Sequence, residues 1–326
     1  MQIFKSKKQS APCMVIFITL LVLGAVGCTG GRGKGVNPYD YGNPEYKSMK
    51  DIPEAHDEVM AFKDPPTPEI PDRTADEYEA LGDAMLKKGS LHIAFLQYER
   101  SLEKQPDNIR VAYKIGKAYL MGNKMEEAEQ QFWKVLEKDP QHASAWEGMG
   151  RVYFARQAYH EAEGYFFKAL TIEKGLWRSH NFLGYIYDAQ GHQSLAAKQY
   201  VEALAIRPRQ GSIYNNLGVA FSMDGRYLEA AEAFQAAIKM NYTEPKVYNN
   251  LGLALAKLEL YDQALEVFIK GVGEAQAYNN MGCIYLNDGD YANAIASFEK
   301  AIEIEPHYYV KAGKNLQKAK KAAQNM

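Results

Sequence analysis

Three stretches of the sequence share one pattern: "SIYNNLGVAF" (residues 212–221), "KVYNNLGLAL" (246–255) and "QAYNNMGCIY" (276–285). Each contains Tyr-Asn-Asn, then an apolar residue, then glycine. Glycine also stands at every 34-residue step before Gly218, and the last step is 30 residues long. The complete column is Gly82, Gly116, Gly150, Gly184, Gly218, Gly252 and Gly282. A fixed period of this length indicates an array built from one supersecondary unit.

Two further columns keep the same period. Twelve residues beyond each glycine stands an alanine: Ala94, Ala128, Ala162, Ala196, Ala230, Ala264 and Ala294. Four residues further stands an aromatic residue: Tyr98, Phe132, Phe166, Tyr200, Phe234, Phe268 and Phe298. Small residues allow two helices to cross closely, and the aromatic rings fill the space beside them. Each unit is therefore expected to be a pair of antiparallel helices that buries its apolar face by stacking on its neighbours.

These columns resemble the tetratricopeptide repeat (TPR) family over residues 75–308. The resemblance implies an all-α TPR solenoid, a right-handed superhelix of about seven helix-turn-helix repeats plus a C-terminal capping helix. The expected repeats are 75–108, 109–142, 143–176, 177–210, 211–244, 245–274 and 275–308, and the expected capping helix is 309–326.

The turns and one irregular repeat can also be predicted. Glycines supply the turn between the two helices, where a positive φ is often needed, at Gly89, Gly191, Gly225 and Gly289. The repeat that begins at residue 245 lacks four residues, and Gly271 and Gly273 stand where its second helix should continue. We expect that helix to be shortened by about one turn.

Residues 1–27 are predicted to be a lipoprotein signal peptide. A lysine-rich start precedes an apolar run from Met14 to Val26, and small residues follow. The end of the run resembles the lipobox of bacterial lipoproteins, which implies a lipid on Cys28. Ala25 stands where lipoboxes usually carry leucine. Ordinary signal peptidase cleavage, which would release a soluble protein with a free Cys28, is the alternative.

Residues 28–74 are rich in proline and glycine and show little apolar periodicity, which predicts a flexible tether. The residue after the cysteine is Thr29 and not the aspartate that is linked with inner-membrane retention. By this resemblance we expect an outer-membrane lipoprotein of the bacterial cell envelope that faces the periplasm, held by its N-terminal lipid.

The paired asparagines suggest a binding surface. In the TPR family the first helix of each unit lines a concave groove, and the two positions before the apolar-Gly pair project toward it. The candidate groove residues are Asn181, Asn215, Asn216, Asn249, Asn250, Asn279 and Asn280. An amide both donates and accepts, so a row of amides would pair with the main chain of an extended peptide. The alternative is that these side chains serve local hydrogen bonds.

Nothing in the sequence supports catalysis or a cofactor. The net charge of −2 gives no field that would favour nucleic acid, and the three cysteines have neither zinc-site nor disulfide spacing. His160 stands near two glutamates, but acidic residues at a helix start suit its dipole, so we expect no metal site. Motifs of zinc proteases and serine hydrolases do not occur in the sequence. We therefore expect a non-enzyme.

The combination of lipobox, Pro-rich leader and repeat array resembles the TPR lipoproteins of tight-adherence (Flp) pilus systems, especially in the tail from Tyr278 to Leu316. This resemblance implies a non-catalytic scaffold in the assembly of a Flp or type IV-like pilus or secretion complex, with secretin or pilus components as partners. An adaptor for peptidoglycan hydrolases is one alternative. An enzyme with its catalytic centre within the helices is another, and the oligomeric state stays open.

Overall fold

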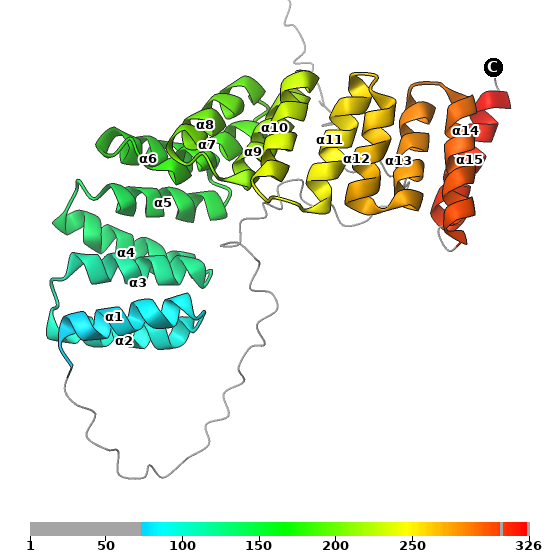
Figure 1. Ribbon diagram of the computed structural model, residues 1–326. Coiled ribbons are helices and arrows are strands. Elements are labelled where there is room, and N and C mark those ends of the chain that lie inside the picture. Colours follow the sequence, from blue (N-terminus) through cyan, green and yellow to red (C-terminus); the bar gives the residue numbers. More distant parts are fainter. Residues whose placement is uncertain (1–72, 307–308, 325–326) are drawn as a thin grey trace, which may run out of the picture.

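The computed structural model describes residues 73–306 and 309–324, and within these ranges the chain forms fifteen α-helices and no strand. The helices are α1 (Ala75–Lys87), α2 (Leu91–Lys104), α3 (Ile109–Met121), α4 (Met125–Lys138), α5 (Ala143–Ala155), α6 (Tyr159–Ile172), α7 (Trp177–Ala189), α8 (Gln193–Ile206), α9 (Gly211–Met223), α10 (Tyr227–Lys239), α11 (Pro245–Lys257), α12 (Tyr261–Val272), α13 (Glu274–Asn287), α14 (Tyr291–Ile304) and α15 (Tyr309–Gln324). The expected all-α array of helical pairs is confirmed (Figure 1). The predicted signal peptide, Cys28 and nearly all of the predicted tether lie outside the described residues.

Each pair is held by contact between its glycine and its aromatic ring. A Cβ atom on Gly184 would lie 2.5 Å from the ring of Tyr200, and a Cβ on any glycine of the column would lie within 2.8 Å of its aromatic partner. All seven rings are buried, as are the seven alanines of the neighbouring column. The close crossing inferred from the sequence is therefore present in every pair, because a larger residue than glycine has no room there.

The turns within the pairs use the left-handed region of φ. The four predicted turn glycines have φ between +76° and +81°. In three other pairs a residue with a side chain takes the same conformation, with φ of +58° at Asn123, +61° at Gln157 and +60° at Glu259. These three residues bear a conformational cost that glycine avoids.

The irregular repeat differs from the expectation. Helix α12 has 12 residues where α14 has 14, so it is shorter by about half a turn rather than by a whole turn. The connection is also compressed, since Gly273 is both the last cap of α12 and the first cap of α13, with φ of +84°. A Cβ on Gly271 would lie 2.2 Å from Cβ of Tyr248, so α12 continues through this glycine against α11.

The helices form an inner and an outer layer. Odd-numbered helices of successive pairs contact one another, as in α3 with α5, α5 with α7, and α9 with α11. Even-numbered helices have no contact of this extent in the described part of the chain. Because the odd-numbered helices approach one another more closely, they line the inside of the curve along which the pairs stack (Figure 1).

Helix α15 closes the end of the array. Ala312, Asn315 and Ala319 are fully buried against the last pair, while Lys314 and Lys321 are exposed. This is the predicted capping arrangement, with basic residues on the outer face. In the described ranges, every helix is too short or too polar to cross a membrane.

Candidate functional site

Polar contacts join most successive odd-numbered helices along the inner layer, and we call this set of contacts the polar seam. Four of the candidate asparagines, Asn216, Asn249, Asn279 and Asn280, belong to it. Asn216 Nδ2 donates to the Tyr185 hydroxyl at 2.7 Å, which joins α9 to α7. Asn280 Nδ2 donates to Asn249 Oδ1 at 3.2 Å, which joins α13 to α11. These bonds run between successive inner helices, because each spans 31 residues, nearly one repeat.

The capping helix continues the seam. Asn315 Nδ2 donates to Asn279 Oδ1 at 3.0 Å, and both side chains are fully buried. The bond joins α15 to α13, so the amide of the last repeat meets an amide of the cap. A buried amide that keeps a hydrogen-bond partner avoids the desolvation cost of an unpaired one.

At the other end of the array the seam is ionic. The buried carboxylate of Glu79 on α1 pairs with Arg110 at 2.6 Å and with Lys114 at 2.7 Å, both on α3. Lys114 also pairs with Asp83 at 2.6 Å. Burial by itself would raise the pKa of Asp83, but the hydrogen bonds that Lys114 and Tyr98 donate outweigh it and hold the pKa below its usual value.

The middle of the seam joins α5 to α7. Ser179 Oγ donates to Glu147 Oε2 at 2.9 Å, and both residues are buried. Burial raises the pKa of Glu147, because the charged form loses its hydration. Arg151 follows on the same helix and is also buried. The inner layer thus changes from ion pairs, through a carboxylate–hydroxyl contact, to amide–amide bonds along the chain.

The seam corrects part of the sequence interpretation. Asn279 is fully buried and bonded to the cap, so the expectation that it lines an open groove is wrong. Asn181, Asn215, Asn216 and Asn280 are also buried, and two of these amides bond to the neighbouring inner helix. Asn249 and Asn250 are only partly buried. The physical reason is the close approach of successive inner helices, which turns these side chains toward the next repeat.

Sequence reasoning missed the residues that pair with the asparagines. The signal lies in the spacing: Glu79 with Arg110, Tyr185 with Asn216, and Asn249 with Asn280 are each separated by 31 residues. Polar residues of complementary kind at that separation predict contacts between neighbouring repeats. The alternative reading of the asparagines, as local hydrogen-bonding groups, fits the bonds that the structure contains.

The described residues contain no cluster of three or more His, Cys, Asp or Glu side chains that could hold a metal ion. His160 is exposed at the start of α6. Cys283, which follows the glycine of the last repeat, is buried and packs with Phe298 and Ala319 in the apolar core under the cap. Its surroundings are those of a space-filling side chain.

Family models that match this chain all describe the same repeat. Tetratricopeptide repeat models match residues 113–175, 183–241 and 223–279, and a further tetratricopeptide repeat model matches residues 275–308. Together these matches span more than half of the chain. A search of curated protein sequences gives no match.

Several solved structures are similar. The Cut9–Hcn1 hetero-tetramer of the APC/C aligns with a TM-score of 0.51 and 23% identity, over 75% of this chain and 49% of that chain. YrrB, described as a TPR protein with an unusual peptide-binding site, aligns with a TM-score of 0.49 and 21% identity, over 58% and 97%. The Pseudomonas aeruginosa protein pilF aligns with a TM-score of 0.47 and 22% identity, over 61% and 92%.

The likeness to the Cut9–Hcn1 structure shows a similar fold. The family models match the repeated sequence of this chain. Paired helices, buried glycine–aromatic contacts and a 34-residue period agree with both. The chain belongs to the tetratricopeptide repeat family.

Proposed function

We propose that this protein is a non-catalytic scaffold that binds an extended segment of another protein along its inner face. TPR arrays in general serve as protein-interaction scaffolds, which supports the general role. The observation that carries the proposal is the polar seam: hydrogen bonds and ion pairs join α1 to α3, α5 to α7, α7 to α9, α11 to α13 and α13 to α15. A surface whose helices are fixed in this way is ordered before the partner arrives, so less entropy is lost on binding.

The contact region is centred on α11. Asn249 and Asn250 retain exposed surface there, while the other five candidate asparagines are buried. Leu253, one turn further along the same helix, is also partly buried and adds an apolar contact. An amide beside an apolar side chain can hold the backbone of a peptide and pack against one of its side chains.

The cellular role rests on the sequence. The lipobox-like end of the leader supports lipidation at Cys28 and an outer-membrane location facing the periplasm. The leader, the array and the tail together resemble the TPR lipoproteins of tight-adherence pili, which supports a role in assembly of a Flp or type IV-like pilus or secretion complex. Adaptors for peptidoglycan hydrolases share the same design, so they are the competing proposal.

Site-specific crosslinking tests the binding face and the partner together. A photo-crosslinking amino acid replaces Asn250 on the inner face, or Gln235, which is exposed on the outer helix α10, in the full chain with a C-terminal tag. We expect one adduct from the position at Asn250 and none from the position at Gln235. Secretin or pilus components in that adduct support the pilus role, whereas amidases or endopeptidases support the alternative. Equal adducts from both positions would contradict binding on the inner face.

A further inference from the structure

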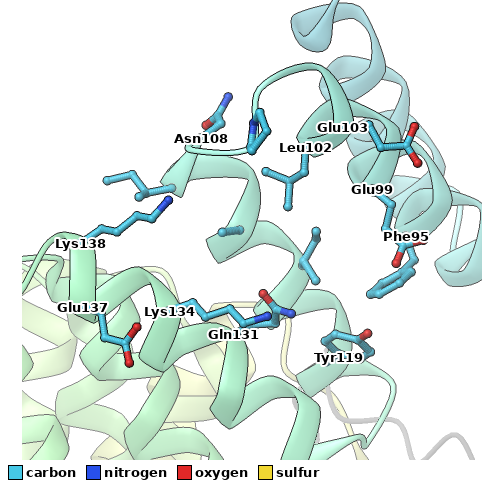
Figure 2. Close-up of a pocket in the computed structure, with 14 residues that line it drawn as sticks. Phe95, Glu99, Leu102, Glu103, Asn108, Tyr119, Gln131, Lys134, Glu137 and Lys138 are labelled. Atoms are coloured by element: carbon cyan, nitrogen blue, oxygen red, sulfur yellow. The ribbon is translucent and has the colours of Figure 1, made fainter.

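A cavity of about 600 Å³ opens between the outer helices α2 and α4, with α3 at its base. Figure 2 shows Phe95 and Leu102 of α2 across the opening from Lys134 and Glu137 of α4. The lining includes Phe95 of α2 and Tyr119 of α3, whose rings meet edge to face with centroids 4.6 Å apart. Its volume falls in the range of pockets that bind ligands.

The cavity exists because one aromatic side chain is missing. Four residues before the repeat glycine, six of the seven repeats carry a ring: Tyr78, Trp146, His180, Tyr214, Tyr248 and Tyr278. The second repeat carries Ala112 at this position, and Ala112 lines the cavity. A methyl group cannot fill the space that a ring occupies in the other repeats.

The next repeat shows what such a ring contacts. Trp146 lies between α4 and α6: its ring meets Trp133 edge to face, with centroids 5.6 Å apart, and stacks on Tyr165 at 5.8 Å. Its Nε1 donates to the carbonyl of Pro140 at 2.9 Å. The ammonium of Lys168 stands 3.5 Å from the ring centre, as a cation–π contact.

Two of these four contacts recur at the cavity, while the two aromatic neighbours are replaced by Glu99 and Gln131. The residues that stand 34 positions before these four contacts are Glu99, Pro106, Gln131 and Lys134, and all four line the cavity. The cavity therefore keeps a backbone carbonyl and a lysine in the places where the next repeat uses them to hold an indole. These groups suit an aromatic ring that carries a hydrogen-bond donor.

The rim of the cavity is acidic. Glu99 and Glu103 of α2 and Glu137 of α4 form no ion pair with another residue in the described part of the chain, and all three are exposed. Lys138 is neutralised by its ion pair with Asp107. Three carboxylates against the single charge of Lys134 leave the rim negative, which favours cations beside the entering group.

We propose that this cavity binds an aromatic side chain of a protein partner, tryptophan or tyrosine, in a segment where lysine or arginine flanks the aromatic residue. The ring enters the space above Ala112, and the flanking cations meet the glutamates of the rim. An aromatic anchor in a preformed pocket is the type of contact that contributes most to interface affinity. The cavity lies on the outer layer, so this second docking site is separate from the proposed inner binding face.

The test uses peptides from a random display library, selected on the full chain and counter-selected on the Ala112→Trp variant, whose indole fills the cavity. We expect the remaining peptides to contain an aromatic residue next to lysine or arginine, and to bind Ala112→Trp at least tenfold more weakly. A Lys117→Trp variant is the matched control, because Lys117 is exposed on the same helix and does not line the cavity. It should bind the peptides as the wild type does.

Thermal unfolding followed by circular dichroism shows whether Ala112→Trp folds. If it does not, the double variant Glu99→Lys, Glu103→Lys replaces it, since both residues are exposed and the change reverses the rim charge. The same peptides should then bind several-fold more weakly. Remaining peptides without aromatic enrichment, or peptides unaffected by either variant, would overturn the proposal. Binding of free indole without any cavity-dependent peptide would also overturn it, in favour of a small-molecule site. None of these results tests the proposed binding of an extended segment along the inner face.

Discussion

The Tyr200 hydroxyl donates a hydrogen bond of 2.7 Å to Asp188 Oδ2, from helix α8 to helix α7. Tyr200 is one of two tyrosines in an aromatic column that otherwise holds phenylalanine. The other, Tyr98, donates to Asp83 at 2.8 Å. Where the column carries a hydroxyl, the first helix of the same pair thus carries an aspartate that accepts from it, so no buried hydroxyl is left unpaired.

The first prediction concerns Asp188. Burial raises the pKa of Asp188 to about 7, although the Tyr200 hydrogen bond acts in the opposite direction. In the unfolded chain this carboxyl ionises near its ordinary pKa of about 4. Between these two values the unfolded chain has lost the proton and the folded chain keeps it, so the free energy of unfolding falls as pH rises from about 4 to about 7. Urea unfolding across this range should show a loss of up to a few kcal/mol from this group.

The Asp188→Asn variant is the control for the pH dependence of the free energy of unfolding. An amide of similar shape still accepts from Tyr200 and does not ionise, so the contribution from this position should vanish. At pH 8 the variant should be more stable than the wild type. Equal slopes for the two proteins between pH 4 and 7 would contradict the assignment.

Asp83 should show the opposite behaviour. Its pKa lies below the usual value, since the hydrogen bonds from Lys114 and Tyr98 outweigh the effect of burial. The stability that this carboxylate contributes is therefore present at neutral pH and is lost as pH falls through its folded pKa. Asp83→Asn should lower the free energy of unfolding at pH 7 by about 0.5–1 kcal/mol, a modest value because the side chain is 40% exposed. Urea unfolding at pH 7 and pH 3 measures this, and the difference between variant and wild type should shrink at the lower pH.

The turn residues give a prediction about backbone strain. Gln157 has φ of +61°, in the place where four other pairs use glycine. Gln157→Gly should raise the free energy of unfolding by up to about 1 kcal/mol, since glycine adopts this conformation without steric cost. Gly191→Ala, at the equivalent turn with φ of +76°, should lower it by about as much or more. Chemical denaturation of both variants against the wild type gives the two differences, and effects of the same sign would refute the explanation.

The fold was predictable from the residues to a large extent because three columns constrain every repeat. A glycine such as Gly184 against a ring such as Tyr200 marks where two helices cross closely, because a larger side chain has no room there. The burial of Asn279 was not predictable, because its side-chain direction depends on the distance between α13 and α15, which no single repeat encodes. The cavity at Ala112 could have been predicted from the sequence, because the other six repeats carry an aromatic ring at this position. The difference appears only when that position is compared across the repeats.

The last prediction tests the junction between the array and its cap. Asn315→Ala removes the donor to Asn279 Oδ1 and leaves a fully buried amide oxygen without this hydrogen bond. Loss of such a bond costs about 1–3 kcal/mol. Because the main contacts of the cap in the described part of the chain are with α13 and α14, the loss should appear as earlier unfolding of α13 to α15, with faster amide hydrogen exchange there than in α1 to α4. The matched change Lys314→Ala, at an exposed residue of the same helix, should alter stability by less than about 0.5 kcal/mol. Equal acceleration of amide hydrogen exchange in all helices would contradict this prediction. It would mean that the whole array unfolds as one cooperative unit and that the Asn315–Asn279 bond does not stabilise the cap locally.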